Sequence, residues 1–232
     1  MVFCITAMVW HSQLLLDDIV HEDGISLSLA AAVSLIGLQL ALIGALGALE
    51  ANLRGMSAGL LALAGFAAIA TEFSAPADPA TSITWQIEAH ILVSMFAYGL
   101  LSAGAIVAIF SLLQDHRLRT GQLSVGSQLF APLETTDKLL QGVTAAGFAG
   151  LCLAVVSGFA FVENLFAQHL VHKTALSLLA LALFGALLAG RHFAGWRGKR
   201  AAYLYLSGFA ILCLAYFGSR FVLEQVLGRS WG

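Results

Sequence analysis

Seven long apolar stretches separated by short polar ones dominate this sequence of 232 residues. Only 10% of the residues are charged, whereas a soluble domain carries about 25% charged residues on average. Each stretch is longer than the ~9–11 residues of a membrane-barrel strand, so we expect helices whose backbone groups pair internally. The prediction is an all-α fold, a polytopic transmembrane helical bundle of about seven membrane helices, surrounded by the lipid bilayer and forming one domain over residues 1–232. The stretches run over 1–16, 26–49, 56–73, 86–113, 138–163, 173–190 and 202–227.

The first stretch differs from the others, because it begins at Met1 with no polar flank and is short for a span. It lacks the basic segment and the small-residue cleavage site of a signal peptide. Two interpretations stay open at this point. Either the true start lies upstream and a further helix is missing, or the stretch is a short span that ends at residues 11–13.

Lysines and arginines predict the orientation of the chain in the membrane. They gather in the loops 114–125 and 190–201, with Arg54 in a third loop, whereas the loops 17–25 and 74–85 contain none. Because positive residues mark cytoplasmic loops, we expect the N-terminus inside and the C-terminus outside. The sequence shows no basic patch of the kind that binds nucleic acid. Its three cysteines lie far apart inside apolar stretches, which argues against thiol–disulfide chemistry within the chain.

Histidines gather toward the predicted outer face. That face holds five of the seven, namely His11, His21, His90, His169 and His172. Ionisable side chains within a bilayer are costly and usually mark a pathway, a cofactor or a partner, and a neutral imidazole is a good ligand for iron, copper or zinc. His90 lies about one turn inside the fourth stretch and shares a helix face with Tyr98, eight residues later. Trp85, just before it, marks the membrane interface.

Each of these residues also has a simpler interpretation. His90 fits a histidine that hydrogen-bonds to a neighbouring helix, and His169 and His172 fit a solvated loop. Lys173 fits either a cation that reaches back to the interface or a partner for a carboxylate. A zinc site needs three or four ligands, and the sequence has neither an HExxH motif nor a histidine pair at i, i+4. A haem needs one or two axial histidines and an apolar slot lined with aromatic residues, which this chain matches better.

Four segments carry a family resemblance: HILVSMFAYGLLSAGAIVAIF from His90, APLETTDKLLQGVTAAGF from Ala131, GWRGKRA from Gly195 and LAYFGS from Leu214. With them the chain resembles the CcsA/CcmC/HemX superfamily of cytochrome c assembly proteins, within it the YpjD/HemX-like branch, best over residues 85–228. The resemblance implies a multi-pass protein of the bacterial cytoplasmic (inner) membrane that handles haem at the outer face. Such a protein serves cytochrome c-type biogenesis with a partner assembly protein, and is not an enzyme in the strict sense.

The resemblance also assigns individual residues. His90 corresponds to the first outer histidine that holds the haem, and Lys173 to the lysine that follows a tryptophan-rich segment. That segment is absent here, where NLFAQHLVHK stands in its place, and FGSRFVLEQVLG lacks the second outer histidine. We therefore expect His90 and His172 to bracket the haem iron, with His169 as the substitute for His172. The candidate cofactor-binding residues are His90, His172, His169, His11, Tyr98, Trp85 and Lys173.

Two other functions stay open. The chain could be a non-haem membrane scaffold or regulator that acts on a partner membrane protein through Arg197, Lys199 and Arg200 in its basic loop. It could also be a small-molecule transporter subunit, which ranks last because the sequence shows no convincing inverted repeat.

Overall fold

The computed structural model describes residues 2–21, 24–25, 28–69, 84–121, 132–161 and 168–218. Within these ranges, seven helices are long and apolar enough to cross a membrane, which confirms the predicted helical bundle. They are α1 (Val2–Ile19), α2 (Leu29–Gly47), α3 (Arg54–Ile69), α4 (Trp85–Arg119), α5 (Leu133–Phe161), α6 (Gln168–Ala194) and α7 (Lys199–Cys213).

Short elements connect or extend these helices. Two-residue strands, β1 (Val20–His21) and β2 (Gly24–Ile25), pair antiparallel after α1. A single 3₁₀ turn, η1 (Ala51–Leu53), precedes α3, and a π-helical turn, η4 (Leu214–Gly218), continues α7. The apolar pattern predicted neither the strand pair nor the π turn.

Several helices extend beyond the apolar stretches that predicted them, whereas α2 is shorter than its stretch 26–49. The first helix runs to Ile19, and α4 runs to Arg119 rather than residue 113. Hydropathy falls where a helix leaves the hydrocarbon, but its backbone hydrogen bonds continue. In α4 an ion pair between Asp115 and Arg119, 2.9 Å apart at i, i+4, favours this polar extension. Residues 70–73 of the third predicted stretch and residues 219–227 of the seventh lie outside the described residues.

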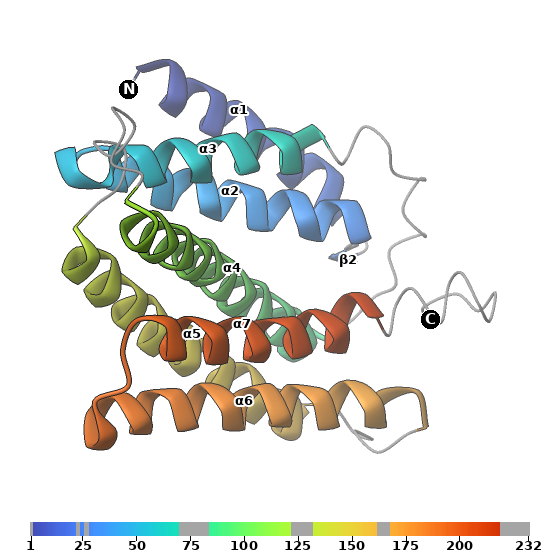
Figure 1. The fold of residues 1–232 in the computed structure, drawn as a ribbon. Coiled ribbons are helices and arrows are strands. Elements are labelled where there is room, and N and C mark those ends of the chain that lie inside the picture. The colour runs from blue at the N-terminus through green and yellow to red at the C-terminus, as the bar shows by residue number, and fades with distance from the viewer. Residues whose placement is uncertain are drawn as a thin grey trace.

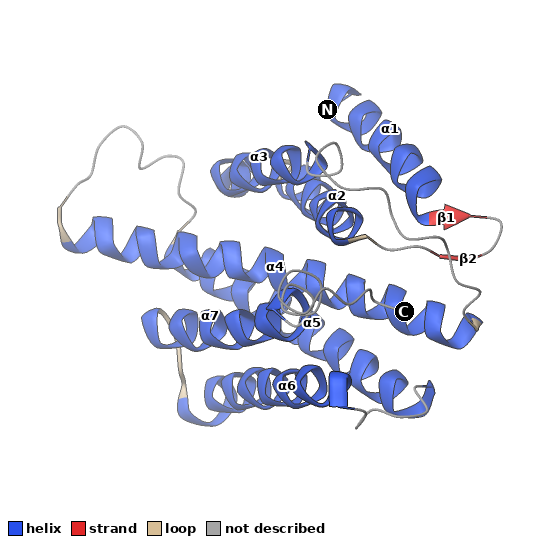
Figure 2. Ribbon diagram, turned by 90° about the vertical axis from the view of Figure 1, so that its right-hand side faces the viewer, coloured by secondary structure: helices blue, strands red, loops and turns tan. Residues whose placement is uncertain are grey.

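The helices form two groups that meet at α4 (Figure 1). The first group contains α1, α2 and α3, and α2 packs against α4. The second group contains α4 to α7, with α4 packed on α5 and α7, and α6 on α5 and α7. Figure 2 shows α4 between the two groups in a second view. The segment that begins α4 and the one that ends α7 therefore reach the same end of the bundle.

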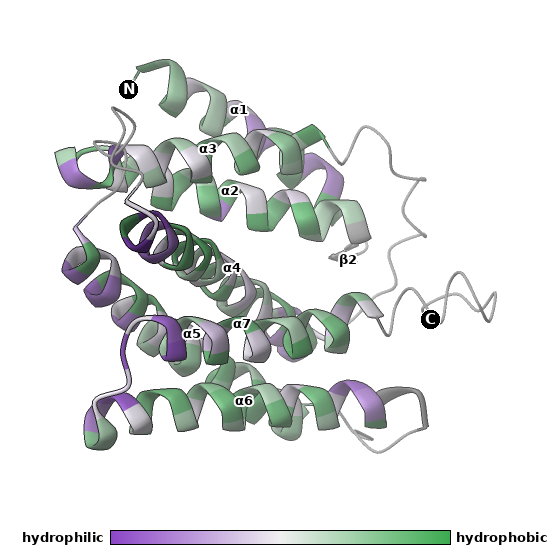
Figure 3. Ribbon diagram, in the orientation of Figure 1, coloured by the Kyte–Doolittle hydropathy of each residue, from purple (hydrophilic) through white to green (hydrophobic). Residues whose placement is uncertain are grey.

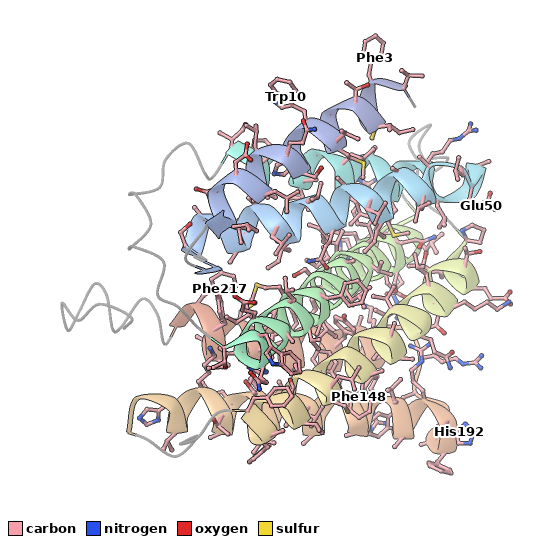
Figure 4. All side chains as sticks on the ribbon, turned by 180° about the vertical axis from the view of Figure 1, so that it is seen from behind. Phe3, Trp10, Glu50, Phe148, His192 and Phe217 are labelled. Atoms are coloured by element: carbon pink, nitrogen blue, oxygen red, sulfur yellow. The ribbon has the colours of Figure 1, made fainter. Side chains whose placement is uncertain are left out.

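Polar residues concentrate at the helix ends (Figure 3). One end carries the C-terminus of α4 and the N-terminus of α7, and Figure 4 shows His192 and Glu50 there, with Phe217 at the opposite end. Large apolar side chains instead face outward along the helices. Phe3 and Trp10 of α1, for example, are 92% and 66% exposed. An apolar outer surface of this kind suits lipid as the surrounding solvent.

The turn between α6 and α7 depends on glycine. Gly195 and Gly198 adopt φ values of +63° and +59°, which residues with a side chain rarely adopt. The Trp196 backbone N–H donates to the Gly190 carbonyl at 3.1 Å, and the Arg200 guanidinium stacks on the Trp196 ring at 4.1 Å. The sequence motif GWRGKRA thus folds as a tight turn, and the predicted loop 190–201 is reduced to residues 195–198.

The core of the second group closes around Tyr205 of α7. Its side chain is fully buried, stacks edge-on against Phe184 of α6 at 5.1 Å and donates its hydroxyl to the Leu101 carbonyl of α4 at 2.9 Å. Gly104 of α4 makes this approach possible, because a Cβ there would overlap the Tyr205 hydroxyl. Small residues at helix interfaces allow such close contact within a membrane.

We expect Gly104→Ala to lower stability although alanine favours helix. The new methyl group must displace the Tyr205 hydroxyl, and overpacking of this kind costs about 1–3 kcal/mol. Gly65→Ala is the matched control, since no atom lies within 4 Å of a Cβ at that position on α3. Thermal unfolding in detergent, followed by circular dichroism, compares the two variants. Equal midpoints for both would contradict the packing argument.

Candidate functional site

His90 lies in the second turn of α4 and contacts α5. Its Nδ1 is 2.9 Å from the hydroxyl of Ser157. The next residue, Gly158, leaves room for the ring, because a Cβ there would lie 3.1 Å from the His90 Cε1. The simpler interpretation of His90, a hydrogen bond to a neighbouring helix, is therefore correct for Nδ1. It leaves the role of Nε2 open, because no hydrogen bond joins that atom to another described side chain.

Lys173 of α6 lies at the same end of the bundle. Its Nζ is 5.2 Å from the centre of the Tyr216 ring in η4, a cation–π geometry. This end of the bundle therefore has one cation and one imidazole, supplied by two different helices.

Tyr98 joins α4 to η4. Its ring packs against Tyr216 at 5.5 Å, and its buried hydroxyl donates to the Leu212 carbonyl at 3.1 Å. Segments of π helix occur frequently at functional sites. Two of the residues predicted from the sequence, Tyr98 and Lys173, thus meet at the Tyr216 ring, and His90 lies eight residues before Tyr98 on the same helix.

The other predicted residues lie apart from this group or outside the description. Trp85 is 69% exposed and packs on Phe161 with ring centres 6.4 Å apart. His172 is exposed on α6, one residue before Lys173, and the side chain of His169 is outside the described part. His11 lies in the other helix group, where its Nε2 is 2.7 Å from the Ser34 hydroxyl of α2. Because α1 continues to Ile19, His11 lies mid-helix and not near a helix end as the sequence suggested.

Gln86 is a polar residue of this region that the sequence analysis missed. It precedes His90 by one turn and so lies on the same side of α4. Its Oε1 is buried, and the described residues offer it no hydrogen-bond partner. A buried acceptor without a donor is uncommon and calls for an explanation. A donor group on a bound molecule would supply one.

The described residues at this end can be compared with what a metal ion and a haem each require. Within the described ranges, no group of three or more His, Cys, Asp or Glu side chains is placed to hold a metal. A haem iron requires only one or two axial ligands. No hydrogen bond joins the His90 Nε2 to another described side chain, Lys173 supplies a positive charge, and the buried Tyr98 and Tyr216 rings pack on each other. Gly158 lets the imidazole pack closely against α5.

Sequence comparisons place most of the chain in one protein family. Residues 7–227 match the family model described as "Cytochrome C assembly protein". Over 137 residues the chain is 32% identical to the "Inner membrane protein YpjD" of Escherichia coli (strain K12), covering 59% of this chain and 52% of that protein. It is 27% identical over 175 residues to the "Cytochrome c biogenesis protein CcsA" of Guillardia theta, covering 68% and 58%.

A third relative is an uncharacterised 28.8 kDa protein of Azospirillum brasilense, 29% identical over 171 residues, with 73% of this chain and 63% of that protein covered. The chain thus spans between half and two thirds of the length of these relatives. No solved structure matches it.

Proposed function

We propose that this chain, which belongs to the family of cytochrome c assembly proteins, binds haem at the end of the bundle where His90 lies. The observation that carries the proposal is the environment of His90. One ring nitrogen is held by Ser157 of the adjacent helix, and the Lys173 ammonium lies over the Tyr216 ring at the same end of the bundle. An imidazole fixed in this way, at membrane depth, is suited to bind an iron in an apolar slot.

Each residue of the site has a distinct role in this proposal. His90 would hold the iron through Nε2, and Lys173 would pair with a haem propionate. Tyr98 and Tyr216 form an aromatic wall of the slot. His172 supplies the second imidazole, and His169 is the alternative for it. Haem, when bound, provides an iron whose potential and ligation the surrounding side chains adjust.

The proposal places this site at the outer face of the membrane. The opposite end carries Arg117, Arg119 and the α6–α7 turn with Arg197, Lys199 and Arg200. Such basic ends face the cytoplasm, so the N-terminus is inside and the C-terminus outside. From there the protein would present haem to a partner of cytochrome c assembly, as the family membership suggests.

A scaffold that acts through the basic loop receives less support. Lys199 pairs with Asp115 at 3.0 Å, and Arg200 stacks on Trp196 at 4.1 Å. The first contact joins α7 to α4 and the second lies within the α6–α7 turn, so two of the three basic residues already have a structural role. A partner would have to compete with those contacts.

An absorption spectrum of the detergent-purified protein tests the proposed function. We expect a Soret band, and sharp α and β bands after reduction with dithionite, as bis-histidine haem gives. If the protein purifies without haem, added hemin should produce the same bands. Absence of a Soret band even with excess hemin would contradict the proposal and favour the scaffold.

A further inference from the structure

Ser157 has one hydroxyl proton and lies within hydrogen-bond distance of two groups, the Ala154 carbonyl and the His90 Nδ1. The Ser157 Oγ donates to the Ala154 carbonyl of the preceding turn at 3.0 Å. A serine hydroxyl carries a single donor and two acceptor lone pairs. Because a carbonyl oxygen only accepts, both hydrogen bonds form together only when the same oxygen accepts from the His90 Nδ1, 2.9 Å away. The proton in that hydrogen bond belongs to the imidazole.

The consequence concerns the two ring nitrogens of His90. A neutral imidazole carries one proton, so a proton on Nδ1 leaves the lone pair of Nε2 free. Histidines that bind metals almost always donate their other ring N–H to a nearby acceptor, which fixes the tautomer and the ring orientation. In this chain the acceptor lies on α5, one residue before Gly158, which leaves room for the ring.

From this geometry we infer that Ser157 is a positioning residue, which holds His90 in the tautomer with its proton on Nδ1 and thereby presents Nε2 to the haem iron. The inference rests on the proposed function for its haem part. The tautomer itself is a property of the protein alone. Ser157 acts through His90 and does not touch the iron.

Selective ¹⁵N labelling of histidine tests the tautomer without haem. In protein purified without added hemin, the nitrogen spectrum of His90, assigned by its loss in His90→Ala, should show a protonated Nδ1 and an unprotonated Nε2. Ser157→Ala should give a mixture of tautomers or a proton on Nε2. Ser157→Thr keeps a hydroxyl and should resemble the parent. A parent with its proton on Nε2, or an unchanged Ser157→Ala spectrum, would overturn the inference.

A hemin titration tests the haem part. Ser157→Ala removes the hydroxyl that accepts from His90, and we expect it to weaken hemin binding about tenfold. This is the lower end of the range seen when a residue that orients a metal ligand is removed. Ser157→Thr should restore binding. Ser102→Ala is the matched control, because the Ser102 hydroxyl also bonds to a backbone carbonyl, that of Tyr98 at 2.7 Å, but touches no histidine.

The two measurements separate the possible failures. If the parent binds hemin and His90→Ala does not, yet Ser157→Ala binds as tightly as the parent, the inference is wrong and the proposed function stands. If the parent binds no hemin, the proposed function is wrong, and so is the haem part of the inference. The nitrogen spectrum still decides the tautomer in that case. Circular dichroism of each variant shows whether the bundle has folded.

Discussion

Replacing His90 with alanine should weaken haem binding by more than the roughly tenfold expected for loss of a residue that only orients the ligand, lower the haem content of the purified protein sharply, and leave the bundle folded. The imidazole is the ligand for the iron in the proposed site, and alanine offers none. Its removal costs the fold little, because Ser157 retains its hydrogen bond to the Ala154 carbonyl. The pyridine haemochrome assay gives haem per protein, and circular dichroism gives the helix content.

Controls make the His90 result specific. His192 is exposed at the opposite end of the bundle, so His192→Ala should keep the haem content of the parent. His11→Ala is the more stringent control, because His11 also lies within hydrogen-bond distance of a serine hydroxyl. That contact joins α1 to α2, away from the proposed site. It too should keep its haem. Equal haem in His90→Ala and the parent would exclude His90 as a ligand.

The sequence predicted the fold well because the hydrocarbon limits what a backbone can do. Without water to bond to, an apolar stretch of this length must become a helix. The helix ends were less predictable, because they depend on polar contacts after the apolar stretch has finished. Asp115 illustrates this, since it lies beyond the predicted end of the fourth stretch but pairs with both Arg119 and Lys199 within the folded chain.

The sequence was sufficient to identify individual residues of the site, but not the residues that they contact. His90 and Tyr98 could be placed on one face of a helix from their spacing alone. Their partners Ser157 and Leu212 come from other helices, 67 and 114 residues away from them in sequence. Which turn of one helix faces which turn of another depends on close packing, here on Gly158 against the His90 ring. One sequence thus shows the chemical groups but not their pairing.

A serine inside an apolar helix is a signal that the sequence analysis could have used. Ser157 lies among alanine, valine and phenylalanine, where a hydroxyl needs a partner within the protein. Combined with an embedded histidine on another helix, it suggests a hydrogen bond, although many serines bond only to their own backbone. Ser94 and Ser102 of α4 do so. The structure was therefore needed to select Ser157 from them.

Breaking the buried ion pair at the other end of the bundle should destabilise the protein strongly. The Arg191 side chain is only 3% exposed, and its Nη2 donates to the Asp137 carboxylate at 2.7 Å and to the Asp137 carbonyl at 3.0 Å. We expect Arg191→Met to lower the free energy of unfolding by about 3 kcal/mol, the lower end for breaking a buried pair. The lower end applies because Asp137, with 23% of its side chain exposed, still reaches water.

Lys138→Met provides the matched control. It removes a positive charge from the same end of α5, but its partner Glu134 is 79% exposed and Lys138 itself 74%, so the loss should be within about 1 kcal/mol. Both variants remove one positive charge from the same side of the bundle, but only Arg191 is buried. Their comparison therefore separates the effect of burial on stability from the effect of charge. The orientation of each must be verified by labelling of introduced cysteines, since positive residues also orient the helices.

Adding Asp137→Asn to Arg191→Met should recover part of the stability, because the carboxylate left without its partner would then be neutral. Unfolding in detergent, followed by helix content, measures each variant. The Arg191 Nη1 is buried with no hydrogen-bond partner among the described residues, so part of the desolvation cost of the native arginine is uncompensated. If Arg191→Met were as stable as the parent, the desolvation cost of the buried arginine would equal the stabilisation that its ion pair with Asp137 provides. The contact between α5 and α6 would then depend on apolar packing alone.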